Sequence, residues 1–134
     1  MPLDALSKER LIDGWLAMQR AVPGSSEYDE LFWASEELDD LCSSSPDDAW
    51  EIVLGVLARN PSDEEVGMLA AGPLADLLAR HGRAIIERVE REARQSPAFA
   101  SLLGGVWQNT MPDDIWARVR AVWDRRGWDD VPQA

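Results

Sequence analysis

The side chains that most often perform nucleophilic catalysis are scarce in this sequence of 134 residues. It contains one histidine, His81, and one cysteine, Cys42. A cysteine nucleophile needs a base beside it and donors for an oxyanion, so His81 would have to meet Cys42 in the fold. The acidic residues near Cys42 should raise the pKa of its thiol, because negative charge opposes thiolate formation. The sequence therefore favours a structural cysteine and a protein that is not an enzyme.

Residues that could hold a metal or a phosphate are also poorly represented. A zinc site of the usual kind needs more Cys and His ligands than one of each. The acidic clusters lack the Asp-x-Asp-x-Asp-Gly spacing of a calcium loop, and Gly104-Gly105 precedes no Lys-Ser/Thr pair. Glu36 and Asp40, four residues apart, form the one carboxylate pair spaced for acid–base or metal chemistry on a helix face. We therefore expect no metal and no cofactor.

A short aromatic and amide segment is a candidate for ligand binding. Trp107, Gln108 and Asn109 follow the double glycine, and a rigid aromatic beside two amides can recognise a ligand or a peptide. The alternative is that the two amides bond to backbone groups of a turn. If the fold brings this segment to other polar and aromatic residues, they would line one pocket. This hypothesis assigns a candidate surface or pocket site to six residues: Trp33, Glu36, His81, Trp107, Gln108 and Asn109.

The net charge of −12 lies entirely in the first half of the chain. Residues 1–67 contain sixteen acidic and four basic side chains, whereas residues 68–134 contain nine of each. Such a chain should repel nucleic acid and an anionic membrane surface, because both are bound through Lys and Arg. It could attract a basic protein partner. The alternative is a charged surface that only keeps the protein in solution.

The elements that must position these residues are helices. Apolar residues recur at helical spacing along nearly the whole chain, and no stretch alternates long enough to predict a strand. Trp15, Trp50 and Trp116 fall on apolar helix faces and are expected in the core. Ser7, Ser45 and the Ser62 capping box mark helix starts. The expected helices run from Ser7 to Arg20, over about 26–44, and from Ser45-Pro46 until Asn60-Pro61 stops the third helix. The later helices are expected over about 63–71, 73–80 and 83–95, from Ser96-Pro97 to Gly104-Gly105, and from Met111-Pro112 to Arg126.

Two breaks in the helical pattern should shape the fold. Pro73 has no N–H to donate and disfavours helical backbone before it, so Gly72-Pro73 predicts a sharp bend or a helix restart. Leu74, Leu77 and Leu78 should then pack into the core. His81-Gly82 predicts a helix end at which the glycine adopts a left-handed conformation.

One internal similarity bears on the architecture. Pro46-Asp47-Asp48-Ala49-Trp50 resembles Pro112-Asp113-Asp114-Ile115-Trp116 at an offset of 66 residues, as in stacked helical repeats. The alternative is a good helix start used twice. The sequence predicts an all-α protein, a single compact domain of six to eight short helices over residues 1–127, with HEAT-like repeat or orthogonal bundle packing. Residues 128–134 are expected to form a loose C-terminal tail.

Four segments of the chain, taken together, resemble a family of small bacterial proteins known only as a domain of unknown function. The resemblance covers about residues 10–123 and implies a bacterial origin and an all-helical fold. It brings no catalytic residues with it. The segments are FWASEEL at 32–38, AWEI at 49–52, AAGPLADLLARHG at 70–82 and GGVWQN at 104–109.

Composition and charge together favour a non-catalytic protein-interaction module. Its acidic residues 27–65 would cover a basic partner, as in an antitoxin-like or immunity-like binder. The alternative is an enzyme or small-ligand binder with a pocket around Trp33, Glu36, His81 and Trp107. A cytoplasmic location is expected, because one cysteine forms no internal disulfide and the N-terminal residues do not resemble a secretory signal. No apolar run approaches the ~20 residues that span a bilayer.

Overall fold

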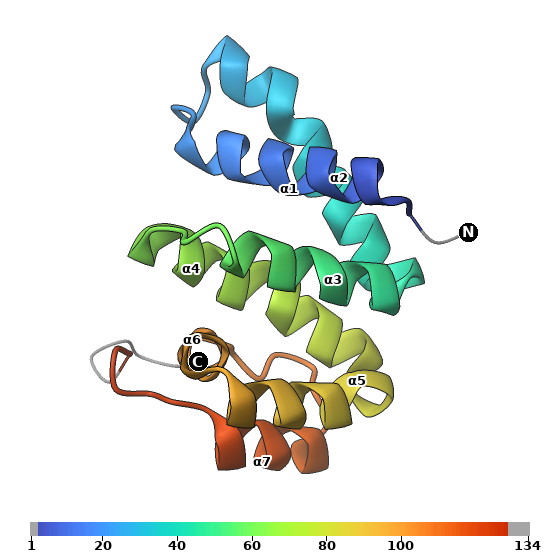
Figure 1. Ribbon diagram of the computed structural model, residues 1–134, viewed down its shortest axis with the longest axis vertical. Coiled ribbons are helices and arrows are strands. Elements are labelled where there is room, and N and C mark those ends of the chain that lie inside the picture. The colour runs from blue at the N-terminus through green and yellow to red at the C-terminus, as the bar shows by residue number, and fades with distance from the viewer. Residues whose placement is uncertain (1–2, 129–134) are drawn as a thin grey trace.

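The computed structural model describes residues 3–128, and every regular element in that range is helical. This confirms the all-α prediction. Figure 1 shows α1 and α2 at the top, α3 and α4 across the middle, and α6 and α7 at the bottom, with α5 running from the middle to the bottom. The elements are α1 (Ala5–Arg20), α2 (Ser26–Ser44), α3 (Pro46–Leu57), α4 (Asp63–Leu69), the π-helical segment η1 (Ala70–Leu74), α5 (Ala75–Gln95), α6 (Pro97–Leu103) and α7 (Asp113–Val122).

Side chains that cap the helices explain most of the helix starts. The capping box at α4 is confirmed: Ser62 Oγ accepts from the Glu65 N–H at 3.2 Å, and Glu65 Oε1 accepts from the Ser62 N–H at 2.8 Å. The first helix differs from the prediction, because Asp4 is its cap and accepts from the Ser7 N–H at 2.7 Å. Ser45 precedes α3 as predicted, but its side chain makes no capping bond.

The predicted helix restart at Gly72-Pro73 is wrong, because the chain stays helical there and accommodates the proline in a π-helical turn. Residues 70–74 form η1, which joins α4 to α5 without interruption. A π-turn contains an extra residue, so it can accommodate a proline that lacks an N–H and would otherwise clash with the preceding turn. The prediction for the leucines is confirmed, because Leu74, Leu77 and Leu78 are fully buried.

His81 is the point at which α5 departs from helical geometry. Its φ of −132° and ψ of 25° produce a kink, after which the helix continues to Gln95. The predicted left-handed Gly82 is wrong, since Gly24 is the glycine with positive φ among residues 3–128. Gly82 instead permits close packing: a Cβ there would lie 2.9 Å from the side chain of Ile115 on α7.

The last helix is shorter than predicted. α7 ends at Val122, and Trp123 has extended backbone. The Asp124 N–H then donates to the carbonyl oxygen of Ala100 on α6 at 2.9 Å, so the chain turns back along α6. Trp128, the first residue of the predicted tail, donates from Nε1 to the carbonyl oxygen of Ser101 at 2.7 Å. Residues 129–134 lie outside the described range.

The core joins all parts of the chain around large buried side chains. Trp15 and Trp50 are buried as predicted, whereas Trp116 is half-buried and packs edge-on against Trp123. Trp50 lies edge-on to the fully buried Phe99 on α6, with ring centroids 5.3 Å apart. This pair links the first half of the chain to the second.

The two similar segments occupy different environments. Asp48 is buried and accepts from the Leu3 N–H at 3.2 Å. Its counterpart Asp114 is exposed and pairs with Arg83 at 2.7 Å. HEAT-like packing stays a prediction.

Candidate functional site

His81, a predicted site residue, holds two helices together. Its Nε2 lies 2.7 Å from the carbonyl oxygen of Ser43, in the last turn of α2. That carbonyl has no partner within its own helix, as is usual for the last four residues of an α-helix. The imidazole therefore caps α2 from the kink in α5, a role that follows from the tertiary structure.

The loop between α6 and α7 contains the three predicted residues Trp107, Gln108 and Asn109. Gln108 Nε2 donates to the carbonyl oxygen of Met111 at 3.2 Å and to Asp113 Oδ1 at 2.8 Å. Asn109 is exposed and has a φ of 50°. Trp107 is half-buried. Gln108 thus bonds to the turn that precedes α7, which was the alternative to ligand recognition.

Trp33 and Glu36 lie on α2 but have different surroundings. The guanidinium of Arg10 lies 4.2 Å from the centroid of the Trp33 ring, a cation–π contact. Trp33 also packs on Gly14 of α1, where a Cβ would meet its ring at 2.7 Å. Glu36 is exposed and lines a groove. Trp33, His81 and Trp107 do not line that groove, so a single site that unites the six residues stays a prediction.

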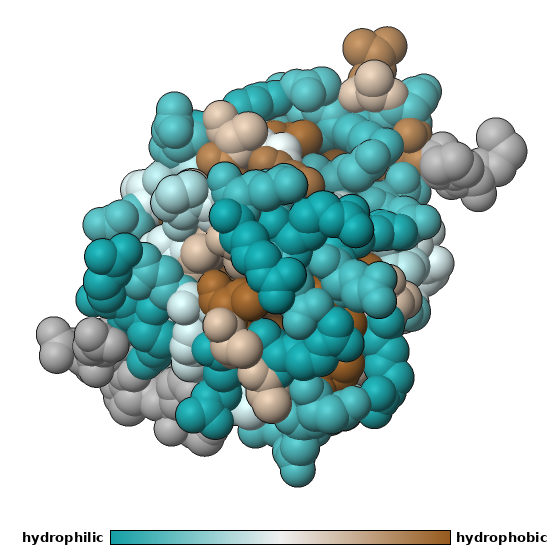
Figure 2. Space-filling model, turned by 60° about the horizontal axis from the view of Figure 1, so that its bottom comes forward, coloured by the Kyte–Doolittle hydropathy of each residue, from teal (hydrophilic) through white to brown (hydrophobic). Residues whose placement is uncertain are grey.

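The candidate binding regions on the molecular surface are hollows rather than broad apolar areas. The face shown in Figure 2 is largely hydrophilic, with apolar residues visible in small patches. A groove of about 370 Å³ lies between the end of α1, one side of α2, and the segment from α4 to α5. We call it the α2 groove. Its volume lies within the range of ligand-binding pockets, ~300–1,000 Å³.

Apolar side chains form one wall of the α2 groove. Phe32 on α2 is 43% exposed and Met68 on α4 is 56% exposed. Tyr28 lies one turn before Phe32, and the two ring centroids are 6.1 Å apart. Aromatic residues and methionine are enriched where proteins bind each other.

Acidic side chains also line the α2 groove. Glu36, Asp39 and Asp76 line the groove, and the residues lining it include no lysine or arginine. Burial raises the pKa of Asp76, the positive charge of Arg80 lowers it, and a hydrogen bond shared with Asp39 raises it again. The groove thus combines an apolar wall with concentrated negative charge.

The π-helical segment contributes the floor of the groove. Gly72 and Pro73 line it, and the Cys42 thiol donates to the Pro73 carbonyl oxygen at 3.5 Å. π-Helical turns are frequent at functional sites. The Gly-Pro signal was visible in the sequence, but the contribution of Phe32, Met68 and Asp76 to one site was not, because three helices have to pack before these residues meet.

Cys42 has a thiol that is difficult to ionise. Burial raises its pKa to about 12, with further increases from the charges of Asp76 and Asp39. The direction predicted from the acidic sequence is confirmed, but burial is the larger cause.

We expect the native protein to react with a thiol reagent such as DTNB at pH 8 at least ~100-fold more slowly than the chain unfolded in urea, because an unperturbed thiol has a pKa near 8.5. Release of thionitrobenzoate, followed by absorbance, measures both rates. Equal rates would show that Cys42 is accessible as a thiolate in the native fold.

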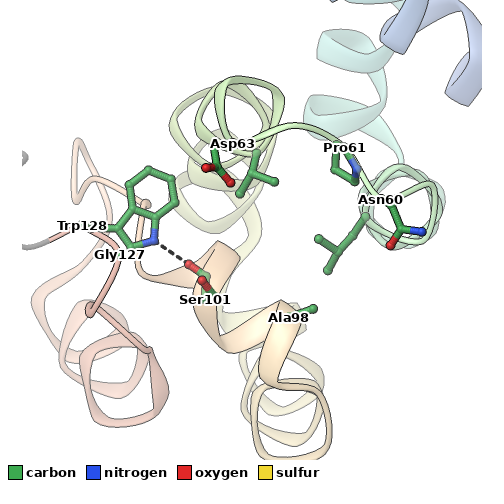
Figure 3. Close-up of a pocket in the computed structure, with 9 residues that line it drawn as sticks. Asn60, Pro61, Asp63, Ala98, Ser101, Gly127 and Trp128 are labelled. Carbon is green, nitrogen blue, oxygen red and sulfur yellow. Dashed lines mark hydrogen bonds between the residues drawn. The ribbon is translucent and has the colours of Figure 1, made fainter.

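A second hollow, also about 370 Å³, lies where the end of α3, the start of α4, α6 and residues 127–128 meet. Figure 3 shows its lining, with Trp128 hydrogen-bonded to Ser101. Neither Lys nor Arg is among the described residues that line it.

The described residues offer neither a membrane-spanning helix nor a metal-binding cluster. Within residues 3–128, no helix is both long enough and apolar enough to cross a membrane. The same part of the chain contains no group of three or more His, Cys, Asp or Glu side chains arranged to hold a metal ion.

Comparison with known protein families gives a match over most of the chain. Residues 22–127 match the sequence profile of a protein family whose function is unknown. No curated protein and no solved structure matches the chain. The matched range contains the residues of α2, α4 and η1 that line the α2 groove.

Proposed function

The chain belongs to DUF6869, a family of unknown function, and from that premise we propose that it is a non-catalytic protein-interaction module. Its ligand is a basic segment of a partner protein, one side of which is apolar. That segment binds in the α2 groove. The observation that supports this most directly is the combination of exposed apolar side chains and several acidic side chains in one hollow.

The apolar wall favours a protein segment over a fully polar ligand. Phe32 and Met68 expose about half of their surface to water, which is unfavourable unless a partner covers them. Methionine adapts its shape to different partners, and an aromatic ring offers a large rigid contact area. Apolar side chains of the partner would therefore pack between α2 and α4.

The charge of α2 favours a basic partner. No lysine or arginine occurs between Arg20 and Arg59, so none lies on α2. The negative electrostatic potential of the acidic side chains on α2 speeds the approach of a positively charged protein and repels nucleic acid. The acidic residues of α2 are Glu27, Asp29, Glu30, Glu36, Glu37, Asp39 and Asp40.

The proposal extends to several features that the sequence suggests. We extend the proposal to an antitoxin-like or immunity-like role, in which the chain binds a basic protein in a bacterial cytoplasm. The acidic and apolar lining of the α2 groove suits such a partner. HEAT-like pairing of the helices is supported by the similarity of residues 46–50 to 112–116. The alternative pocket around Trp33, Glu36, His81 and Trp107 has less support, because His81 and Trp33 are engaged in contacts between helices.

A defined peptide tests the proposal. An amphipathic fourteen-residue peptide of lysine and leucine, labelled with a fluorophore, is expected to bind, whereas the same peptide with glutamate in place of lysine is not. The double variant Phe32→Ser, Met68→Ser should weaken binding about tenfold or more, because both apolar contacts are lost. Glu36→Gln should weaken it less, and mainly at low salt. Fluorescence anisotropy measures each dissociation constant.

Matched variants separate the groove from the general surface. Leu6 and Val22 are exposed apolar residues that do not line the groove, and Glu30 is an acid of α2 that also lies outside it. The double variant Leu6→Ser, Val22→Ser and the variant Glu30→Gln should bind as the native protein does. The proposal is overturned if the two double variants lose affinity equally, or if neither peptide binds.

A further inference from the structure

We propose that the hollow beside Trp128 is a second binding site, which takes a small organic cation that has an apolar body. This goes beyond the proposed function, because the site shares no lining residue with the α2 groove. We call it the Trp128 pocket, and its principal residues are Leu57, Asn60, Asp63, Val66, Ser101 and Trp128.

The indole of Trp128 is held in place before any ligand arrives. Its Nε1–H donates to the carbonyl oxygen of Ser101 at 2.7 Å, and its own carbonyl oxygen accepts from Arg125 Nη2 at 2.9 Å. Arg125 Nη1 donates to the carbonyl oxygen of Gly104 at 2.7 Å, which ties the segment to the end of α6. A ring fixed in this way loses little freedom when it binds a ligand.

The walls of the pocket suit an apolar body of limited size. Leu57 from α3, Val66 from α4 and Ala98 from α6 converge on the hollow, and Pro61 closes it between α3 and α4. Its volume of about 370 Å³ lies at the small end of the range for ligand pockets. A single ring or a short alkyl chain fits such a space.

The charge of the ligand follows from Asp63. Among the described residues that line the pocket it is the one ionisable side chain, and within residues 3–128 it forms no hydrogen bond or ion pair. Figure 3 shows Asp63 and Trp128 toward one end of the hollow, and Asn60 and Pro61 toward the other. A carboxylate and an indole face both attract a cation and repel an anion. An ammonium group therefore fits the end with Asp63, with its hydrocarbon part against the apolar walls.

Three probes of the same size test this assignment. Benzylammonium should bind at millimolar concentration, benzyl alcohol at least about fivefold more weakly, and benzoate not at all. Binding is followed by the NMR shift of the Trp128 indole N–H, which is identified by its loss in the variant Trp128→Phe. Because this N–H lies at the pocket, its titration reports this site rather than the α2 groove.

Two matched variants test the role of the carboxylate. Asp63 and Glu64 both lie in the first turn of α4, but only Asp63 lines the pocket. Asp63→Asn should weaken benzylammonium binding about tenfold or more, while Glu64→Gln should leave it unchanged, although both remove one charge from the same helix end. The proposal is overturned if the two variants behave alike, if benzyl alcohol binds as well as benzylammonium, or if no probe shifts the indole signal.

Discussion

Phe99→Ala is expected to lower the free energy of unfolding by about 3–5 kcal/mol, the cost of emptying a well-packed aromatic site. Phe99 is fully buried and lies edge-on to Trp50 at 5.3 Å between ring centroids. Its loss removes both the burial of the ring and the favourable aromatic geometry. Urea unfolding, followed by circular dichroism at 222 nm, measures the change.

A conservative substitution at Phe99 and a substitution at an exposed residue serve as controls for this prediction. Phe99→Leu retains most of the apolar volume and should cost clearly less than the alanine variant. Leu6 is 82% exposed on α1, so Leu6→Ala should change the free energy of unfolding by no more than ~0.5 kcal/mol. A loss below 1 kcal/mol for Phe99→Ala would mean that the contact between α3 and α6 is not part of the stable core.

Gly104→Ala is expected to lower the free energy of unfolding by about 2–3 kcal/mol, because the added methyl group has no space. A Cβ at Gly104 would overlap the backbone carbonyl oxygen of Asp124 and lie 2.8 Å from Cδ1 of Trp128. Backbone atoms cannot rotate away as a side chain can. Residues 124–128 would have to leave α6, so the Asp124–Ala100 and Trp128–Ser101 hydrogen bonds would be lost.

The matched control for this variant is Gly127→Ala. A Cβ at Gly127 would meet nothing within 4 Å, and the φ of Gly127 is not positive. This variant should therefore leave the free energy of unfolding unchanged or raise it by up to ~1 kcal/mol. Urea unfolding compares the two variants, and the Trp128 indole NMR signal should shift only in Gly104→Ala. Equal stabilities would show that residues 124–128 do not pack on α6.

The two hollows share one short helix, α4. α4 contributes Val66 to the Trp128 pocket and Met68 to the α2 groove. The peptide and the ammonium probes therefore examine two sides of one short helix. Failure of one set of binding experiments leaves the other interpretation intact, because the lining residues are different.

The sequence by itself determined the helices and most of their inward faces. The Ser62 capping box and the burial of Leu74, Leu77 and Leu78 could all be predicted. The physical reason is that these features depend on residues within about one helical turn of each other. A capping bond spans three residues, and an apolar face repeats with the helical period.

Tertiary structure decided the features that depend on residues far apart in the chain. α7 ends early because the Asp124 N–H bonds to Ala100 on α6 instead of continuing its own helix. His81 became a cap for α2, and Asp48 became a buried acceptor for the Leu3 N–H. No local sequence pattern predicts these hydrogen-bond partners, because each bond forms only after separate helices have packed.

The candidate sites show the same division. The sequence identified Glu36 as a candidate and Gly72-Pro73 as a break, and both line the α2 groove. It gave no indication that Phe32 and Met68 would remain exposed, since an apolar residue on a helix is expected to face the core. Only the packing of α2 against α4 and η1 determines which apolar side chains are covered and which are left to line a hollow, because burial depends on neighbours that the local sequence does not specify.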